Sequence, residues 1–365
     1  MALKVAIVGL PNVGKSTLFN ALTQTAAAQA ANYPFCTIEP NVGDVAVPEP
    51  RLEALATIAR SKEIIPARIN FVDVAGLVRG ASKGEGLGNQ FLANIRDCDA
   101  VAFVARCFEG GDVTHVEGRV DPIDDLEIIE TELMLADLES LEKRHDNLEK
   151  RAKAGDKDSA KTLSLVKLAL EQLNAGRPAR AAKVPPEDEK AWRMLQLITS
   201  KPALYVCNVD EESAAEGNVL SARVEQRAAG DGAKAVVISA KIESEIALLD
   251  ASERAEFLET LGLEEPGLNR MIREAYSLLG LQTYFTVGPK EARAWTIPVG
   301  ATAPQSAGVI HTDFEKGFIR AETIAYPDYV ALNGEGGARE AGKMRLEGKE
   351  YVVRDGDVMH FRFNT

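Results

Sequence analysis

The chain has few of the residues that build disulfide frameworks, metal clusters or membrane spans. Its 365 residues include four cysteines and four histidines. The cysteines are isolated in the sequence, which excludes a disulfide framework and a CxxC-type zinc site. No apolar run is long enough to cross a bilayer, and the opening MALKVAIVG lacks the pattern of a secretory signal. We therefore expect a cytoplasmic protein with no membrane contact.

Positive charge is also scarce. Lys and Arg number 42 against 55 Asp and Glu, which gives a formal net charge of −13. This balance excludes a protein that coats nucleic acid by bulk attraction, so any RNA contact must be local. Apolar residues make up 45% of the chain, enough for about two or three domains with real cores.

Five short apolar runs, rich in β-branched residues, have the pattern of buried strands and alternate with helical stretches. They are residues 3–9, 68–74, 100–108, 203–208 and 234–239. The alternation predicts an α/β fold with a doubly wound, mainly parallel sheet.

One segment breaks this alternation. From residue 124 to about 173, apolar residues recur at spacings of 3 and 4 and are interrupted by a polar, glycine-containing turn at 152–158. The pattern predicts two helices that fold back as a coiled-coil hairpin. His145 stands at one position of this seam and is expected to pack there rather than bind a ligand.

After about residue 279 the sequence pattern changes again and predicts short strands and turns. We expect a small, separate α+β domain there, with one helical stretch around 302–312. The expected domains are a sheet domain at 1–123 and 200–279, an inserted helical hairpin domain at 124–199, and the small domain at 280–365.

The stretch GLPNVGKST, residues 9–17, matches GxxxxGK[ST] between the first predicted strand and a helix. In such a P-loop, backbone N–H groups surround the phosphates, Lys15 reaches the β and γ oxygens, and the Ser16 hydroxyl ligates Mg²⁺. The sheet domain is therefore a P-loop nucleotide-binding domain. Its predicted phosphate contacts are Asn12, Val13, Gly14, Lys15, Ser16 and Thr17.

A second motif follows in the expected order. DVAG, residues 73–76, ends an apolar run and lets Asp73 hold the Mg²⁺ shell while the Gly76 N–H meets the γ-phosphate. Thr37, in the intervening loop, is expected to complete Mg²⁺ coordination and to sense the γ-phosphate. We predict Ser16, Thr37 and Asp73 at the metal, with Lys15, Gly76 and Thr37 acting on the reacting phosphate.

The order GLPNVGKS, NYPFCTIEPN and DVAGLVRGASKGEGLGNQFL, with a helical insertion and a small C-terminal domain, resembles the Obg-like ATPase family and specifically its YchF subfamily. The resemblance covers essentially the whole chain. It implies an Obg-type P-loop domain, a coiled-coil hairpin and a β-grasp domain of the TGS type. It also implies a preference for ATP and a link to ribosomes and to translation or stress control.

Hydrolysis should be slow. Ras-like GTPases place a water-orienting glutamine directly after DxxG, but here that residue is Leu77, which forms no hydrogen bonds through its side chain. Help must come from a cation, a partner or another side chain. Asn12 resembles the asparagine that coordinates K⁺ in related GTPases. His115 is a candidate water-orienting group, although an ordinary exposed loop histidine is the alternative reading.

NVDE, residues 208–211, occupies the place of the guanine-reading NKxD motif, and SAK at 239–241 that of its supporting loop. Val209 replaces the lysine and Glu211 replaces the aspartate, so guanine selectivity should fail. The alternative is a GTP-using protein in which Asp210 reads guanine. The predicted base contacts are Asn208, Val209, Glu211, Ser239, Ala240 and Lys241.

Two function classes remain. The protein is either an ATPase whose hydrolysis is the product, or a nucleotide-gated module whose ATP state sets docking to a large partner such as a ribosome. The hairpin and the terminal domain favour docking, with RNA contact through residues 280–365. Cys36 beside Thr37 suggests a redox-sensitive switch, for which a small buried apolar role is the alternative.

Overall fold

The computed structural model describes residues 3–30, 41–74, 87–110 and 119–364. Two compact units make up the chain, one of residues 1–44 with 70–275 and one of residues 45–69 with 276–365. Across the part that is described, no helix is both long and apolar enough to span a bilayer.

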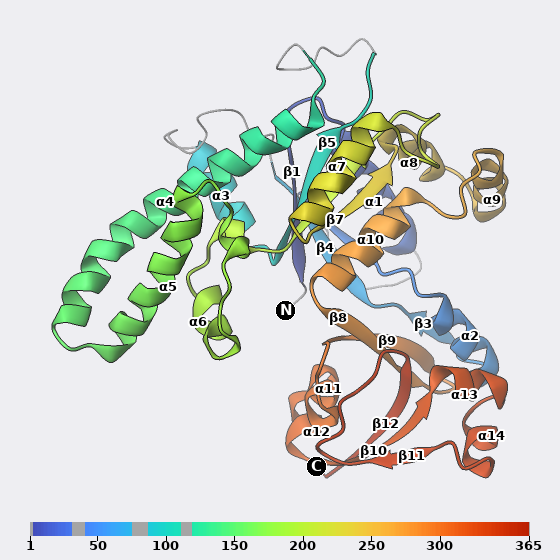
Figure 1. Cartoon of the computed structure of the whole chain (residues 1–365). Coiled ribbons are helices and arrows are strands. Elements are labelled where there is room, and N and C mark those ends of the chain that lie inside the picture. Colours follow the sequence, from blue (N-terminus) through green and yellow to red (C-terminus); the bar gives the residue numbers. More distant parts are fainter. Residues whose placement is uncertain (1–2, 31–40, 75–86, 111–118, 365) are drawn as a thin grey trace. The chain divides into compact units, whose positions relative to one another are not determined.

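The first unit is built on a six-stranded sheet in the order β2-β4-β1-β5-β6-β7 (Figure 1). From β4 to β7 every neighbouring pair runs parallel, which confirms the predicted fold class. The bounds are β1 Lys4–Gly9, β2 Val42–Ala46, β4 Arg68–Asp73, β5 Ala100–Arg106, β6 Ala203–Asn208 and β7 Lys234–Ile238. Only β2 was not predicted, since its sequence VGDVA is short and interrupted by an aspartate.

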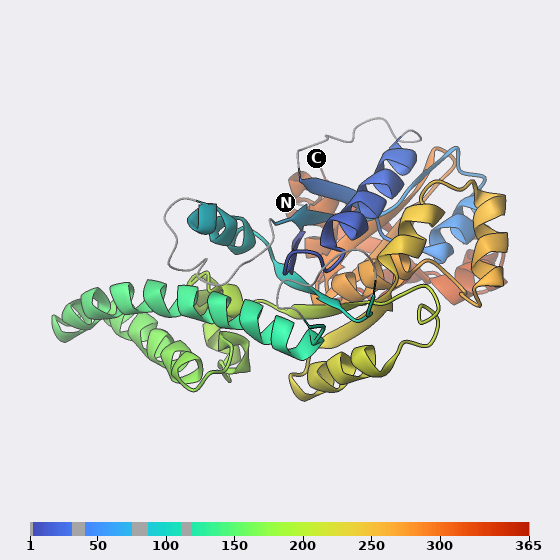
Figure 2. The ribbon, with the colours of Figure 1, turned by 90° about the horizontal axis from the view of Figure 1, so that it is seen from above.

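Helices cover both faces of this sheet, so β5 and β6 are buried along their whole length. Figure 2 shows α1 and α7 on opposite faces. The helices of this unit, apart from those of the insertion, are α1 Lys15–Ala30, α3 Leu87–Arg96, α7 Val219–Gly230, α8 Ala240–Ile246, α9 Ala251–Thr260 and α10 Gly267–Leu278. The arrangement brings the carboxyl ends of β1, β4, β5 and β6 to one edge, where α/β proteins bind ligands.

The predicted hairpin consists of α4 Pro122–Lys153 and α5 Lys157–Asn174, which lie side by side (Figure 1). Gly155 turns the chain with φ of 94°, and Asp156 caps α5 by accepting from the N–H of Ser159 at 3.2 Å. Short helical turns follow: η2 Ala179–Ala181, η3 Pro186–Asp188, α6 Glu189–Arg193 and η4 Ile198–Ser200. One apolar cluster joins the hairpin, through Leu141 and Val166, to Ala179 of η2, Trp192 of α6, and Leu195 and Leu197.

Buried carboxylates fasten the hairpin to the sheet and to η4, the helical turn that precedes β6. Glu130 of α4 accepts from the Tyr205 hydroxyl of β6 at 3.0 Å and pairs with Arg180 and with Arg227 of α7. Asp137, fully buried, accepts from the N–H of Thr199 at 2.8 Å and from its hydroxyl at 2.7 Å. The base of the insertion is therefore bound to the strand that leads into NVDE.

The second unit holds a mixed sheet in the order β11-β10-β12-β8-β9-β3. Its strands are β3 Glu63–Ile65, β8 Leu281–Val287, β9 Glu291–Pro298, β10 Phe318–Ala325, β11 Arg345–Glu347 and β12 Asp357–Phe363. Its helices are α2 Pro50–Ala59, α11 Ala303–Ile310, α12 Thr312–Lys316, α13 Tyr326–Ala331 and α14 Glu335–Glu340. The core joins Tyr284, Phe361 and Ala307 of α11, which lies where the sequence predicted a helix.

Residues 45–69 belong to this second unit, although the expected boundaries placed them with the P-loop domain. Strand β3 pairs in parallel with β9, and the Ser61 hydroxyl donates to the Gly288 carbonyl at 2.7 Å. Arg51 of α2 pairs with Asp355 at 2.7 Å. A three-residue strand carries too little periodicity to reveal such a partner from sequence.

Candidate nucleotide-binding site

The phosphate-binding loop connects β1 to α1, between Gly9 and Lys15. Gly14 has φ of +90°, and a Cβ there would collide with the side-chain amide of Asn208. At Gly9, a Cβ would lie 2.9 Å from Val13 and 3.1 Å from the Val104 carbonyl. Both glycines are thus required by close packing of the loop against the sheet edge, and Asn12 adds a left-handed turn with φ of 67°.

Lys15 and Asp73 converge beside this loop. Lys15 begins α1 and Asp73 ends β4, directly opposite Ile7 of β1. The Lys15 ammonium is in contact with the Asp73 carboxylate, and both side chains are mostly buried. The two groups predicted to hold the phosphates and the Mg²⁺ shell are therefore brought together by the fold.

The oxygen donors here suit a magnesium ion. Ser16, the next residue of α1, is exposed at the helix N-terminus, and the carboxylate of Asp73 lies nearby through its pairing with Lys15. No cluster of three or more His, Cys, Asp or Glu forms a metal site among the described residues. Mg²⁺ takes few protein ligands and completes its shell with phosphate oxygens and water.

Asn208 links the two halves of the site. It is 4% exposed; its amide nitrogen donates to the Val13 carbonyl at 2.8 Å, and its amide oxygen accepts from the Ala240 N–H at 2.9 Å. The side chain thus joins the phosphate loop to the SAK loop. The N–H of Val209 donates to the Ile238 carbonyl at 2.9 Å and belongs to the sheet.

The predicted base contacts lie together at this end of β6. Glu211 pairs with Lys241, both side chains being substantially exposed, and this hydrogen bond raises the pKa of Lys241. Asp210 caps a turn instead, accepting from the Ser213 N–H at 2.9 Å. The Ser239 hydroxyl is buried and has no hydrogen-bond partner among the described residues.

Several predicted residues lie outside the part of the chain that the structure describes. They are Cys36, Thr37, Gly76, Leu77 and His115. Sequence reasoning also missed a residue that the structure places beneath the P-loop, Arg106 at the end of β5. The available signal was a charged residue inside the otherwise apolar run AVAFVARCF.

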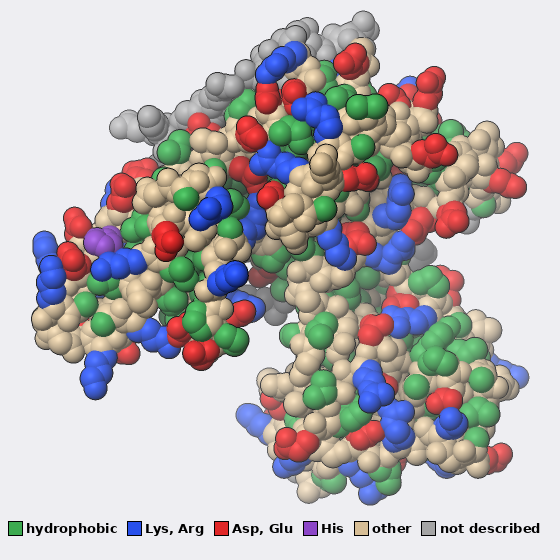
Figure 3. Space-filling view, in the orientation of Figure 1, with side chains coloured by type: hydrophobic (Ala, Val, Ile, Leu, Met, Phe, Trp, Pro, Cys, Tyr) green, Lys and Arg blue, Asp and Glu red, His purple; other side chains and the backbone are tan. Residues whose placement is uncertain are grey.

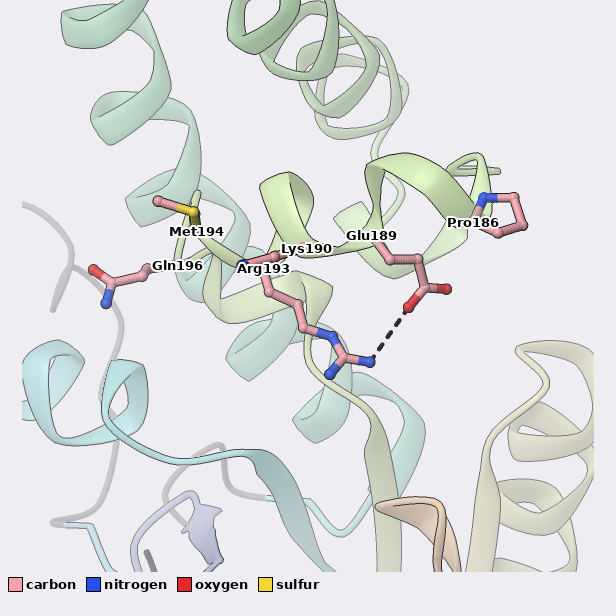
Figure 4. Close-up of a pocket in the computed structure, with 6 residues that line it drawn as sticks. All are labelled: Pro186, Glu189, Lys190, Arg193, Met194 and Gln196. Atoms are coloured by element: carbon pink, nitrogen blue, oxygen red, sulfur yellow. Dashed lines mark hydrogen bonds and ion pairs between the residues drawn. The ribbon is translucent and has the colours of Figure 1, made fainter. Parts of the chain in front are cut away.

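A hollow on the surface lies away from this edge. It has a volume of about 600 Å³ and is formed around α6 (Figure 4). Its lining consists of Pro186, Glu189, Lys190, Arg193, Met194 and Gln196. Within the lining, Arg193 donates to Glu189 at 3.3 Å, as the dashed line in Figure 4 marks. It shares no residue with the phosphate loop or the base end.

The fold and this edge define a P-loop nucleotide-binding protein of the GTPase type. A family model described as a 50S ribosome-binding GTPase matches residues 4–136, and a second, named YchF-GTPase_C and described as a protein of unknown function, matches residues 281–364. The chain is 59% identical to the "Ribosome-binding ATPase YchF" of Haemophilus influenzae and 55% identical to that of Bacillus subtilis, each over the full length of both chains.

A solved structure agrees. The YchF GTPase of Schizosaccharomyces pombe superposes with a TM-score of 0.87 at 37% identity, covering 99% of this chain and 97% of that one. The chain belongs to the YchF family.

Proposed function

We propose that this protein is a Mg²⁺-dependent ATPase that hydrolyses ATP slowly and acts as a nucleotide-gated switch on the ribosome, in translation or stress control. The main observation behind the proposal is that Lys15 contacts Asp73 beside a P-loop whose packing requires glycine at positions 9 and 14. Family relatives from H. influenzae and B. subtilis carry the name ribosome-binding ATPase, which supports the same activity here.

In the proposed reaction, Lys15 moves from Asp73 to the β and γ oxygens when a nucleotide enters, and Asp73 turns to the metal shell. Ser16, Asp73 and the proposed Thr37 would hold Mg²⁺, which would neutralise charge at the phosphates when bound. The backbone N–H groups of the loop and the Gly76 N–H hold the oxygens that gain charge.

Slow turnover follows from Leu77, which leaves the attacking water without a side-chain partner at the usual position. Asn12, exposed in the P-loop, is proposed to hold a K⁺ ion that supplies the missing positive charge. His115 is the second proposed source of help, as a group that orients the water.

Adenine selection is proposed to depend on Glu211 together with Lys241. Guanine offers two adjacent donors to a carboxylate, whereas the adenine amino group needs a single acceptor. Because Lys241 forms an ion pair with the Glu211 carboxylate, that carboxylate is less available to accept both hydrogen bonds from guanine. The turn-capping bond of Asp210 argues against the alternative, a GTP-using protein in which Asp210 reads the base.

A docking role is supported by the charge of the hairpin. Residues 143–167 carry eight Lys or Arg and four Asp or Glu in a chain whose net charge is −13. Basic side chains gather at the far end of the hairpin in Figure 3. In the second unit, Arg320 and Arg362 stand opposite each other on β10 and β12 with His360 nearby, which supports RNA contact there. The predicted location is the cytoplasm.

The test compares ATP turnover with and without ribosomes, together with equilibrium binding of fluorescent ATP and GTP analogues in Mg²⁺. We expect slow basal turnover, a rise with ribosomes, and tighter binding of ATP. Lys15→Ala should abolish nucleotide binding, and the exposed Lys290→Ala should not. Turnover that ribosomes leave unchanged would make the protein a free-standing ATPase, and tighter GTP binding would overturn the proposed base selection.

A further inference from the structure

A buried arginine beneath the phosphate loop has no place in the site derived so far. Arg106 is the last residue of β5, whose seven residues are all buried, and it is only 3% exposed. Burial of a guanidinium is costly unless its N–H groups are bonded. The bonds it makes therefore indicate what the charge holds in place.

Among the residues that the structure describes, the guanidinium donates to three backbone carbonyls. Its Nη2 lies 2.8 Å from the Gly110 oxygen, its Nε 3.3 Å from the Phe108 oxygen, and its Nη1 3.5 Å from the Asn12 oxygen. The central carbon also lies 4.4 Å from the centre of the Phe108 ring. The ring and the two nearby carbonyls fix the planar group, and the third bond reaches into the P-loop.

The sheet register places this contact beside a matching one. Arg106 and Asn208 are direct partners on the neighbouring parallel strands β5 and β6. Asn208 donates to the Val13 carbonyl at 2.8 Å. Two adjacent side chains at the sheet edge thus hold two consecutive carbonyls of the loop, those of Asn12 and Val13.

A trans peptide points its C=O and its N–H in opposite directions. When the Asn12 carbonyl is held toward the sheet, the N–H of Val13 must point away from it, into the loop. The same holds for the Val13 carbonyl and the N–H of Gly14. These N–H groups are the ones that a P-loop offers to phosphate oxygens.

We propose that Arg106 is a positioning residue for phosphate binding, which fixes the Asn12–Val13 peptide so that the Val13 N–H faces the bound phosphates. It acts through the loop and does not touch the nucleotide. The inference rests on the phosphate site proposed above. Because it concerns the phosphates alone, its effect is the same for every nucleoside triphosphate.

The test uses Arg106→Met and Arg106→Lys, titrated with MgATP, MgGTP and AMP. Loss of a charge-assisted bond to the loop should lower the affinities for ATP and GTP by the same factor, roughly tenfold or more in Arg106→Met. The affinity for AMP, which lacks the β- and γ-phosphates, should change little. Lysine keeps the charge but lacks the planar fork, so Arg106→Lys should lose less affinity. A general loosening of the fold would lower the affinity for AMP as well.

Three further variants make the result decisive. Arg270→Met removes another arginine that donates to a strand carbonyl of the same sheet, Val237 at 3.0 Å, and should leave nucleotide affinity unchanged. If Lys15→Ala binds ATP like the wild type, the proposed phosphate site is wrong. If Lys15→Ala loses ATP while folded Arg106→Met stays within twofold of wild type, the positioning role is overturned. Phe108→Leu retains the arginine and should show a smaller loss in the same direction; unchanged affinity in a folded Phe108→Leu would likewise overturn it.

Discussion

Glu243 makes the stability of the P-loop unit depend on pH. It lies on α8, which carries the SAK loop at its start, and is 2% exposed. One oxygen accepts from the Gly267 N–H at 2.7 Å, at the start of α10, while the other has no hydrogen-bond partner among the described residues. Burial raises the pKa of this carboxyl to about 7, despite opposing contributions from the Gly267 and Leu268 backbone and from Arg270 and Arg254.

The direction in which stability changes with pH follows from proton binding. Between about pH 4.5 and 7 the folded protein holds a proton on Glu243 that the unfolded chain has released. Stability contributed by this group is therefore fully present at low pH and is lost as the pH rises through that window. A shift of this size corresponds to about 3 kcal/mol in the free energy of unfolding.

Urea denaturation of the wild type and of Glu243→Gln at pH 5 and pH 8 measures this contribution. Glutamine is neutral at both values and keeps an oxygen for the Gly267 N–H, so the variant should gain roughly 2–3 kcal/mol relative to wild type between pH 5 and pH 8. Glu245→Gln, on an exposed position of the same helix, should show no such gain. A constant difference between wild type and Glu243→Gln across this range would refute the reasoning.

Three other predictions concern the site and its attachment. Asp73→Asn should weaken ATP binding tenfold or more in Mg²⁺ and much less in EDTA, as titration in the two buffers would show; an equal loss in both would remove Asp73 from the metal shell. Lys241→Met should raise GTP affinity relative to ATP by a small factor, about two- to fivefold, because an exposed ion pair is weak; an unchanged ratio in competition binding would contradict the role given to the pair with Glu211. Asp137→Ala should cost about 3–5 kcal/mol by urea denaturation, since it leaves buried N–H groups at Ile198 and Thr199 unpaired; a cost below about 1 kcal/mol would show that water replaces the carboxylate.

Five strands of the P-loop sheet, all except β2, could be predicted because each is a largely apolar run in a parallel sheet that helices cover on both faces. The hairpin could be predicted for a similar reason, since its apolar residues repeat with the period of paired helices. Residues 45–69 could not. Their attachment to the second unit depends on β3 pairing with β9 and on Arg51 meeting Asp355, and neither a three-residue strand nor one ion pair leaves a periodic signal.

The site also contains residues that could be predicted from the sequence and one that could not. A linear motif names Lys15 and Asp73, because their spacing from a strand end is fixed by the local chain path. Arg106 belongs to no such motif. Its role appears only when β5 and β6 are aligned, which sets it beside Asn208 under the P-loop.

The Asn208 amide has a consequence for how the NVDE motif works. Its nitrogen holds the Val13 carbonyl of the phosphate loop, and its oxygen holds the Ala240 N–H of the base loop. Movement of either loop must therefore be transmitted to the other or break a buried hydrogen bond, which costs about 1–3 kcal/mol. Changes at Val209 and Glu211 can alter which base fits without disturbing this link, because neither side chain contributes to it. We therefore expect Asn208 to be the part of the motif that phosphate binding requires, and the proposed base contacts after it to be the part that can vary with the base.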